Sequence, residues 1–457
     1  MKKILLITLL ITAFNSKAQC WETVSVGERH VVGIQNNGTL WSWGFNADDG
    51  ALGNGTTWST NVPTQIGSAT DWKEVNASSV HSFAIKENGT LWSWGSNLKG
   101  NLGSGSTALY SLVPVQIGSS QWKMVRAGSD HSVGIKVDGT LWGWGDNQDA
   151  TVGDGTFIDK STPVLINGST NWKMVSCNLA RNIAVKEDGT LWAWGQNSPS
   201  FGFLPADPVG GQAYVKVPSQ IGLDTDWKYA VAGNGYFLAI KNDNTLWAWG
   251  GGANGKLGNG STTSIPWPTQ IGTDTDWEML EADSFSSFAI KTNGTLWAWG
   301  RNILGNLGNG TQNDLLVPTQ ISTSSDWKTV TTSYNSTTAL KADGSLYSWG
   351  SNAFGTFGDG TFVNQYSPVL INTCALGTED FTKNNVVLYP NPVQNRLFID
   401  TQETQQYQIY SILGVKISEG TLAVGNNIDC SSLPSGVYLL NLVDNSGNST
   451  ILKFVKQ

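Results

Sequence analysis

Charged residues are scarce in this chain, and no part of it is rich in basic residues. Asp, Glu, Lys and Arg make up 14% of the 457 residues, and the formal net charge is −8 at pH 7. A protein that binds nucleic acid needs a patch of Lys and Arg to neutralise phosphates. The composition therefore argues against a nucleic-acid partner, and the acidic balance indicates little beyond solubility.

The residues that most often hold metals or act as nucleophiles are also few: three histidines and four cysteines. The sequence contains no His-Glu-x-x-His, Gly-x-Ser-x-Gly or Cys-x-x-Cys motif. Asp48-Asp49-Gly50 lacks the spaced oxygen ligands of a calcium loop. We therefore expect no metal and no cofactor. An active site built from scattered carboxylates remains open as an alternative.

Only the start of the chain carries a long hydrophobic run. A basic beginning, Met1-Lys2-Lys3, is followed by apolar residues 4–14, which are too few to span a bilayer stably. Small residues then stand where a signal peptidase cuts, so we predict a signal peptide over residues 1–18, cleaved between Ala18 and Gln19. We expect an exported protein with no transmembrane segment in its mature form.

Glycine and tryptophan are abundant, with 53 and 22 residues. Many glycines and few charged residues indicate an all-β protein with tight turns. One motif, Leu-Trp-x-Trp-Gly, holds much of the tryptophan; it starts at Leu40, Leu91, Leu141, Leu191, Leu246, Leu296 and, with Tyr for the first Trp, Leu346. Alternating large and small apolar residues suit a strand buried on both faces. We interpret its tryptophans as blade-packing residues rather than as a binding strip.

Each motif belongs to a longer repeat that opens with its own tryptophan. The opening residues are Trp21, Trp72, Trp122, Trp172, Trp227, Trp277 and Trp327, so the period is close to 50 residues. Each repeat has four strand-like segments, and pairs such as Asn88-Gly89 between the second and third favour a type I′ hairpin. Four-stranded units that cannot bury their faces alone predict a seven-bladed β-propeller over residues 19–376.

A second motif, Leu-Gly-x-Gly or a close variant, lies in the loop between the third and fourth strands, as at Leu52-Gly53-Asn54-Gly55. Repeat four replaces it with Phe201-Gly202-Phe203-Leu204-Pro205 and has five additional residues. A long loop that departs from a strict period often carries function. We therefore expect a partner to dock near residues 201–215.

The four cysteines can form disulfides if the chain is exported. Cys20 precedes the first repeat and Cys374 follows the last, and these places are neighbours in a closed ring. We predict a disulfide between them, with two free thiols as the alternative. Cys177 and Cys430 lie in strand-like segments and are expected in the core. Cys20 also raises a lipoprotein alternative, but Lys17 stands where a lipobox has Leu.

The period stops after Ile371, and a different segment follows. Residues 377–385 are polar and are predicted to be a linker. Residues 386–457 contain no tryptophan, and their alternating strands and Pro-rich turns suit a small β-sandwich.

The repeat resembles the regulator of chromosome condensation family in its opening Trp and in both motifs, from Trp21 to about Ile371. The resemblance implies a seven-bladed propeller but no single function, because members include exchange factors, a plant photoreceptor and a secreted bacterial inhibitor of β-lactamase. The photoreceptor sequence Gly-Trp-Arg-His-Thr is replaced here by Gly27-Glu28-Arg29-His30-Val31. An exchange factor needs a GTPase that an exported protein would not meet.

The C-terminal segment resembles the type A sorting domain of the type IX secretion system. The resemblance rests on residues 388–392 (Leu-Tyr-Pro-Asn-Pro), 412–414 (Ile-Leu-Gly), 433–438 (Leu-Pro-Ser-Gly-Val-Tyr) and 453–457 (Lys-Phe-Val-Lys-Gln). It implies recognition by the secretion machinery and passage across the outer membrane of a Bacteroidota-type cell, followed by release or surface attachment. An ordinary accessory β-sandwich is the alternative.

The three histidines share one position. His30, His81 and His131 each lie nine residues after the opening Trp of their repeat. Equivalent positions of different blades lie around a ring, so the three side chains could converge on a metal. We favour the alternative, a repeat-consensus residue whose ring nitrogens bond the turn backbone.

The strand order indicates where a partner would bind. The turn between strands one and two and the loop between strands three and four share one face of the ring, the loop face; the Asn-Gly turns lie on the other, the turn face. The loop face collects aromatic residues, which are favoured interface anchors: Trp58, Tyr110, Phe157, Phe201, Phe203, Tyr214, Trp267, Phe362 and Tyr366. The alternative is that these rings tuck between blades or under their own loops.

Two functions of different classes follow from these patterns. The first is an exported or cell-surface binding propeller, delivered by type IX secretion, whose ligand is an unidentified extracellular protein or glycan. The second is a secreted hydrolase or lyase that acts on polysaccharide at the channel. Facing carboxylates about 5–10 Å apart in the channel would favour the second, and an aromatic loop face without an acidic pocket would favour the first.

Overall fold

A computed structural model describes residues 20–46, 49–197, 213–372, 388–399, 405–411, 416–423, 427–443 and 449–457. Within these residues the chain consists of strands and one short 3₁₀ helix, η2 (Ala253–Gly255), which confirms the all-β prediction. No helix in this part of the chain is long and apolar enough to cross a membrane. The repeats and the C-terminal segment form two separate compact units.

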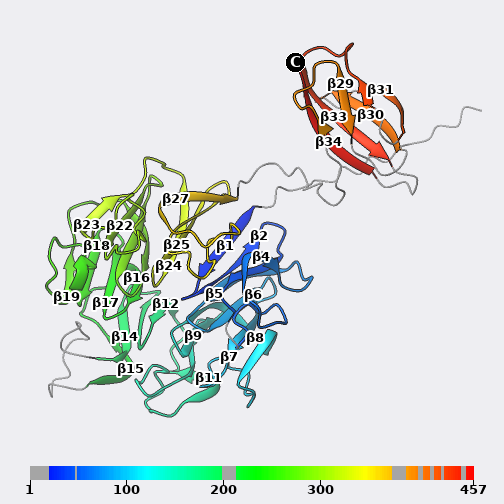
Figure 1. Ribbon diagram of the computed structural model, residues 1–457. Helices are drawn as coiled ribbons and strands as arrows, with labels where there is room; N and C mark the ends of the chain where they lie inside the picture. The colour runs from blue at the N-terminus through cyan, green and yellow to red at the C-terminus, as the bar shows by residue number, and fades with distance from the viewer. Residues whose placement is uncertain are drawn as a thin grey trace, which may run out of the picture. The chain divides into compact units, whose positions relative to one another are not determined.

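Each repeat is an antiparallel meander in chain order, and Figure 1 shows the meanders arranged around a ring. The propeller strands are β1 (Trp21–Val26), β2 (His30–Gln35), β3 (Leu40–Gly44) and β4 (Thr60–Gln65); β5 (Trp72–Ala77), β6 (His81–Lys86), β7 (Thr90–Ser96) and β8 (Tyr110–Ala127); β9 (His131–Lys136), β10 (Leu141–Gly145) and β11 (Lys160–Ile166); β12 (Trp172–Asn178), β13 (Arg181–Lys186), β14 (Leu191–Gln196) and β15 (Tyr214–Gln220); β16 (Trp227–Gly233), β17 (Tyr236–Lys241), β18 (Leu246–Gly250) and β19 (Ile265–Gln270); β20 (Trp277–Ala282), β21 (Ser286–Lys291), β22 (Leu296–Gly300) and β23 (Leu315–Gln320); β24 (Trp327–Ser333), β25 (Ser336–Lys341), β26 (Leu346–Gly350) and β27 (Gln365–Asn372).

The seven repeats make six sheets, because repeats two and three share β8. This strand has 18 residues. Its first part pairs with β7, and its last part pairs with β9. Four residues separate Ile117 from Trp122, whereas five separate Ile66 from Trp72 and the corresponding pairs of later repeats. The shorter connection has no room to turn away, so the two sheets run into a single seven-stranded one.

The two sequence motifs are the two sides of one contact between neighbouring repeats. Trp94, from the second repeat's Leu-Trp-x-Trp-Gly, is fully buried and donates from Nε1 to the Ala51 carbonyl of the first repeat at 2.9 Å. Gly53 of the Leu-Gly-x-Gly loop lies under the same indole, where an added Cβ would approach Trp94 Cδ1 to 2.5 Å. The motif tryptophans therefore pack blade against blade, as interpreted from the sequence.

The first repeat packs against the last, and in Figure 1 the blue and yellow strands lie side by side. Trp43 Nε1 donates to the Thr356 carbonyl at 2.8 Å, and Trp21 N donates to the Gly344 carbonyl at 3.2 Å. Cys20 is disulfide-bonded. Its predicted partner, Cys374, lies outside the described residues, so the pairing itself stays a prediction.

The other two cysteines are free thiols. Cys430 is buried in the C-terminal unit, as expected. Cys177 is only partly buried: it packs at the edge of a core cluster, as expected in part, and also contributes to the lining of the central channel. The predicted signal peptide, including Ala18 and Gln19, and the predicted linker lie outside the described residues.

The C-terminal unit consists of two sheets around one core, the small β-sandwich predicted from the sequence. One sheet has the order β28 (Leu388–Tyr389), β29 (Arg396–Ile399), β32 (Asn427–Asp429), and the other β31 (Lys416–Leu422), β30 (Gln405–Ser411), β33 (Gly436–Val443), β34 (Ser449–Lys456). Leu397 and Ile428 from the first sheet are buried together with Ile409, Leu440 and Phe454 from the second.

Candidate functional site

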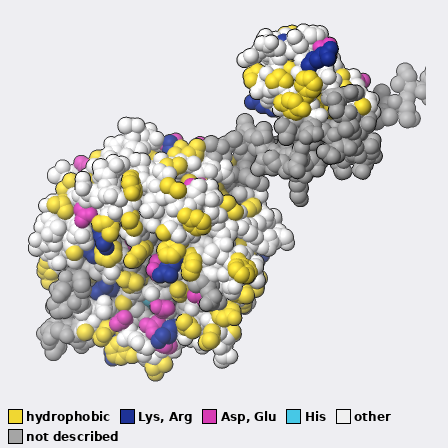
Figure 2. Space-filling view, in the orientation of Figure 1, with side chains coloured by type: hydrophobic (Ala, Val, Ile, Leu, Met, Phe, Trp, Pro, Cys, Tyr) yellow, Lys and Arg dark blue, Asp and Glu magenta, His cyan; other side chains and the backbone are white. Residues whose placement is uncertain are grey.

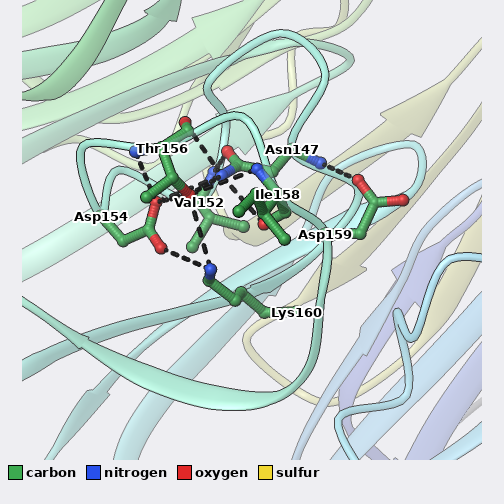
Figure 3. Close-up of polar contacts among 7 residues, drawn as sticks. All are labelled: Asn147, Val152, Asp154, Thr156, Ile158, Asp159 and Lys160. Atoms are coloured by element: carbon green, nitrogen blue, oxygen red, sulfur yellow. Dashed lines mark hydrogen bonds and ion pairs between the residues drawn. The ribbon is translucent and has the colours of Figure 1, made fainter.

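The loops of the loop face are held in shape by a buried asparagine, shown for repeat three in Figure 3. Asn147 Oδ1 accepts a hydrogen bond from Val152 N at 2.9 Å, and its Nδ2 donates to the carbonyls of Thr156 and Ile158 at 3.1 and 3.2 Å. Asn147 is fully buried. One amide thus fixes both ends of the loop.

The same asparagine recurs at Asn46, Asn97, Asn302 and Asn352, each of which accepts from the backbone of the glycine loop. It follows the strand motif as Trp-Gly-x-Asn, a pattern that is visible in the sequence but was not used in the sequence-based interpretation. Repeat five has Gly252 in its place. Rigid loops are suited to recognition because little conformational entropy is lost on binding.

The aromatic residues predicted for the loop face differ in their exposure. Trp58 is 80% exposed and Phe362 is 63% exposed, while Tyr110, Phe157, Trp267 and Tyr366 are between 42% and 50% exposed. Tyr214 is partly buried. Phe201 and Phe203, with the rest of residues 198–212, lie outside the described residues.

Among those of these rings that the structure describes, one pair is in contact. Phe157 and Tyr214 meet edge to face with centroids 5.5 Å apart. Tyr366 packs on the loop of the preceding repeat, and Phe362 packs on its own loop, because a Cβ added to Gly305 or Gly355 would come within 2.3 or 3.3 Å of their rings. Phe157, Tyr214 and Tyr366 are therefore partly covered by neighbouring side chains or loops, whereas Phe362 touches its own loop but keeps most of its surface exposed.

Trp58, Tyr110 and Trp267 make no ring–ring contact with any described residue. On the face drawn in Figure 2, hydrophobic side chains likewise lie in separate patches over the propeller rather than in one continuous area. A partner of the loop face would therefore contact individual anchors on separate loops.

A second candidate site is the central channel, a cavity of about 530 Å³ lined by the first strand of every repeat. Two rings of side chains line it. The second residue after each opening Trp contributes Thr23, Glu74, Met124, Met174, Tyr229, Met279 and Thr329. The fourth residue contributes Ser25, Asn76, Arg126, Ser176, Val231, Glu281 and Thr331.

In five of the seven repeats the fourth-position side chain accepts a hydrogen bond from the next repeat; Arg126 and Val231 have no acceptor. Ser25 Oγ accepts from Ala77 N at 3.0 Å, Asn76 Oδ1 accepts from Ala127 N at 2.7 Å, and Ser176 Oγ accepts from Ala232 N at 3.1 Å. Thr331 Oγ1 closes the ring by accepting from Val26 N at 3.3 Å. Polar residues at this position are therefore explained by the fold.

The charged residues of the two rings, Glu74, Arg126 and Glu281, are not repeated at the equivalent positions of the other blades. Arg126 Nη1 donates to Glu74 Oε1 at 2.7 Å. Burial raises the pKa of Glu281 to about 8, although its carboxyl group accepts a hydrogen bond from the backbone of Thr332. Burial likewise raises the pKa of the Tyr229 phenol to about 12. At neutral pH the two rings therefore hold one ion pair together with a protonated Glu281; Glu28 and Asp283, from turns that follow the first strands, also line the cavity.

The histidines also serve contacts between repeats. His30, His81 and His131 hydrogen-bond through Nε2 to Ser82 Oγ, Ser132 Oγ and Asn182 Oδ1 of the next repeat, at 2.7, 3.2 and 2.9 Å. Burial lowers the pKa of His30 to about 4 and that of His81 to about 3. They are repeat-consensus residues, as favoured above. Their Nε2 partners are side chains of the neighbouring blade, and His131 also has a hydrogen bond to the turn backbone at Leu179. Among the described residues, no three His, Cys, Asp or Glu side chains are grouped to hold a metal.

Comparison with known families agrees with the repeat architecture. A family model described as the regulator of chromosome condensation (RCC1) repeat matches residues 37–85, 88–135, 138–178, 243–288, 293–340 and 343–394. The chain belongs to the RCC1 repeat family. The unmatched residues between 178 and 243 include most of repeat four, where the loop departs from the RCC1 pattern.

The C-terminal unit matches a second family, the secretion system C-terminal sorting domain, over residues 387–457. This domain implies export through the type IX secretion system and an interaction with its machinery. The RCC1 repeats of this chain are thus attached to a sorting signal.

Individual relatives resemble only part of the chain. The RCC2 homolog of zebrafish is 38% identical over 90 residues, which are 19% of this chain and 18% of the relative. The ultraviolet-B receptor UVR8 of Arabidopsis thaliana is 36% identical over 84 residues, 18% of this chain and 19% of the receptor. The matches thus span about a fifth of each relative's length.

Solved structures resemble a larger share of the chain at lower identity. Yeast RCC1 (Prp20), solved bound to Kap60, is 18% identical over 82% of this chain and 88% of its own, with a TM-score of 0.65. Human WBSCR16 is 21% identical over 69% and 85%, with a TM-score of 0.61. At these identities the likeness shows the propeller fold alone.

Proposed function

We propose that this protein is a recognition module that is exported by type IX secretion, released or held at the surface of a Bacteroidota-type cell, and binds an extracellular protein or glycan through its loop face. Trp58 is the observation that carries the proposal. It is 80% exposed, yet the backbone beneath it is fixed by Asn46, whose Nδ2 donates to the carbonyls of Thr56 and Trp58 at 2.7 and 3.3 Å.

A rigidly held and exposed tryptophan is costly in water and favourable at an interface. Its ring contributes nothing to the core here, because its surface remains in solvent. Buried against a partner, a tryptophan anchor typically contributes about 2–4 kcal/mol. Because the loop is already ordered, little of that gain is lost to fixing it. The expected docking point near residues 201–215 remains a further part of this proposal.

The hydrolase or lyase alternative has one observation in its favour. Glu281, with its raised pKa, and Glu74, which pairs with Arg126, resemble the acid and base pair of a glycosidase. Both carboxyl groups, however, already have partners. Glu74 is paired with Arg126, and Glu281 accepts a hydrogen bond from the backbone of Thr332. The equivalent bond in four other repeats is accepted by a serine, threonine or asparagine side chain. We therefore place recognition ahead of catalysis.

The test is capture of surface proteins and glycans by the purified protein and three single variants. Trp58→Ser and Phe362→Ser remove loop-face anchors, and Val137→Ser removes an apolar side chain of similar exposure, 62%, next to the Asp138-Gly139 hairpin on the turn face. We expect the first two to weaken capture at least tenfold and the third to leave it unchanged.

Equal capture by all three variants would reject the loop face as the binding surface. A second comparison shortens residues 201–215 to the length of the other repeats. Weaker capture with an unchanged unfolding midpoint would place the partner next to repeat four, and unchanged capture would remove that loop from the proposal.

A further inference from the structure

The wall of the channel has two different halves. In the second-position ring, repeats three to six supply Met124, Met174, Tyr229 and Met279, whereas repeats one, two and seven supply threonine or glutamate. Apart from Met1, the chain has no methionine other than these three. Methionine is flexible and polarisable, and it suits surfaces that adapt to apolar ligands. Four consecutive repeats therefore present an apolar arc.

The fourth-position ring is broken in repeat three, below that arc. There the position is Arg126, which has no acceptor and cannot make the bond that Ser25 or Asn76 makes to the next repeat. The corresponding backbone N–H belongs to Cys177, and both residues contribute to the channel lining. Repeat five also lacks an acceptor at this position, where it has Val231. Repeat three alone places a guanidinium where five of the seven repeats place an acceptor for an N–H group.

Arg126 retains donors beyond its structural contacts. Both hydrogen bonds that it makes to described residues use Nη1: one to Glu74 at 2.7 Å and one to the Val125 carbonyl at 2.8 Å. The side chain is 33% exposed. A guanidinium has five N–H donors and can serve two carboxylates at once. The Nε and Nη2 groups can therefore bind a second anion.

Four carboxyl groups line the cavity. Glu28 and Asp283 belong to turns that follow the first strands, whereas Glu74 and Glu281 lie in the same two rings as Arg126 and tolerate an added carboxylate there. Glu74 is already paired with Arg126. Glu281 carries a proton at neutral pH, because burial raises its pKa to about 8, and so adds no repulsion. Tyr229 is also neutral, because burial raises its pKa to about 12.

We propose that the channel binds a small amphipathic carboxylate, with its anionic group between the free donors of Arg126 and Cys177 N and its apolar body against Met124, Met174, Tyr229 and Met279. The cavity volume, about 530 Å³, is within the range of small-molecule sites. The ligand is either a free organic acid or the C-terminal carboxylate of a peptide that ends in an apolar residue. The site uses none of the aromatic anchors of the loop face, although turns of that face line the cavity, and it does not depend on the proposed function.

Titration calorimetry with the purified protein tests the proposal. The probe is 4-phenylbutyrate, its neutral counterpart is 4-phenylbutanol, and the peptide arm compares a short peptide ending in Phe as free acid and as amide. We expect the acids to bind at least tenfold more tightly than the alcohol and the amide. Binding of only the small acid identifies a free acid as ligand, and binding of only the peptide acid identifies a chain end.

The variant that removes the anion site is Glu74→Gln with Arg126→Met, because Arg126→Met alone would leave the Glu74 carboxylate unpaired. We expect at least a tenfold loss of phenylbutyrate binding, with no change in Arg301→Met, whose guanidinium lies over Phe285 and does not line the channel. Equal binding of acid and alcohol, or an acid preference that survives the double variant, would overturn the proposal.

A measurement on the unaltered protein guards against a double variant that does not fold. Hydrogen peroxide oxidises accessible methionines, and mass spectrometry reports the rate at each. We expect the acid that binds in the calorimetry, 4-phenylbutyrate or the peptide acid, to slow oxidation of Met124 and Met279 at least threefold, and its neutral counterpart to leave the rates unchanged. Equal rates with and without that acid would overturn the proposal independently of any variant.

Discussion

Charged side chains are handled in opposite ways on the turn face of the ring and in its channel. On the turn face, a lysine lies against two aromatic rings in every repeat from two to seven; Lys86, for example, is 4.8 and 5.2 Å from the rings of Trp72 and Trp92. In the channel, Arg126 and Glu281 each occur once. A charge that recurs in each blade is explained by packing, whereas one that occurs once is not required by the fold.

Repeat four also differs from the other repeats in the glycine that packs beneath the motif tryptophan of the next blade. The glycine beneath the motif tryptophan recurs in every repeat except the fourth. Trp249, the motif tryptophan that follows repeat four, is fully buried, and its Nε1 has no hydrogen-bond partner among the described residues. The loop of repeat four that corresponds to the acceptor loops of the other repeats lies outside the described residues.

The largest effect is expected from breaking a recurring contact. In Gly103→Ala, the new Cβ would approach Trp144 Nε1 to 2.7 Å at a backbone φ of +72°. Strain at positive φ and overpacking of the core together should cost about 2–5 kcal/mol of unfolding free energy. Gly67→Ala is the matched control, because its φ is +61° and nothing lies within 4 Å of the added Cβ. Chemical denaturation measures both.

We expect the control to lose only about 1 kcal/mol, the cost of the left-handed backbone alone. If the two variants lose equal stability, the glycine is required for its backbone conformation and not for the approach of the indole.

A smaller effect is expected from varying the turn-face lysines. Lys241 lies over Trp227 and Trp247 and forms ion pairs with Asp224 and Asp226 at 2.7 and 3.1 Å. Lys136 also lies over two tryptophans, but it has no carboxylate within ion-pair distance in the described chain, and burial lowers its pKa. Lys241→Met should cost about 1–2 kcal/mol, and Lys136→Met less than about 0.5 kcal/mol.

Denaturation in low and high salt distinguishes the causes. The Lys241 effect should shrink at about 1 M salt, since its aspartates are half exposed and screened. A loss that is independent of salt would assign the stabilisation to the aromatic rings instead.

The repeats could be predicted from the sequence because they are encoded locally. A hairpin pair such as Asn88-Gly89 sets the strand order, and the period near 50 residues sets the number of units. The shared strand β8 was missed because its cause is a single residue missing before Trp122, which a search for motifs does not weigh.

The candidate site was less accessible to prediction. Trp58 was expected on the loop face from strand order alone and is the most exposed of the aromatic residues singled out there that the structure describes. Arg126 and Glu281 were not singled out, although each is the fourth residue after an opening Trp. Their position reveals nothing until it is known that the first strand of each meander is the one that lines the channel. Comparison of that position across the repeats would then have identified both.

The smallest effect is expected from the ionisation of Glu281, a channel carboxyl group that has no counterpart at the equivalent position of the other repeats. Burial raises the pKa of Glu281 from 4.5 to about 8, so the folded state holds a proton that the unfolded state has released between those values. Folding stability should therefore fall as pH rises from about 5 to 8. We expect this loss of unfolding free energy to be on the order of 1 kcal/mol, because water in the channel reduces the cost of ionising Glu281. Glu281→Gln cannot ionise and should not show the loss.

Unfolding midpoints at pH 5, 6.5 and 8 measure the difference between the protein and Glu281→Gln. Asp283, whose pKa burial raises to about 6, titrates in the same direction but is present in both proteins, and Arg126, Glu74 and Tyr229 are also common to both. The gap between the two curves therefore reports Glu281. A constant gap from pH 5 to pH 8 would mean that Glu281 is ionised throughout, and the channel would then repel the carboxylate it is proposed to bind.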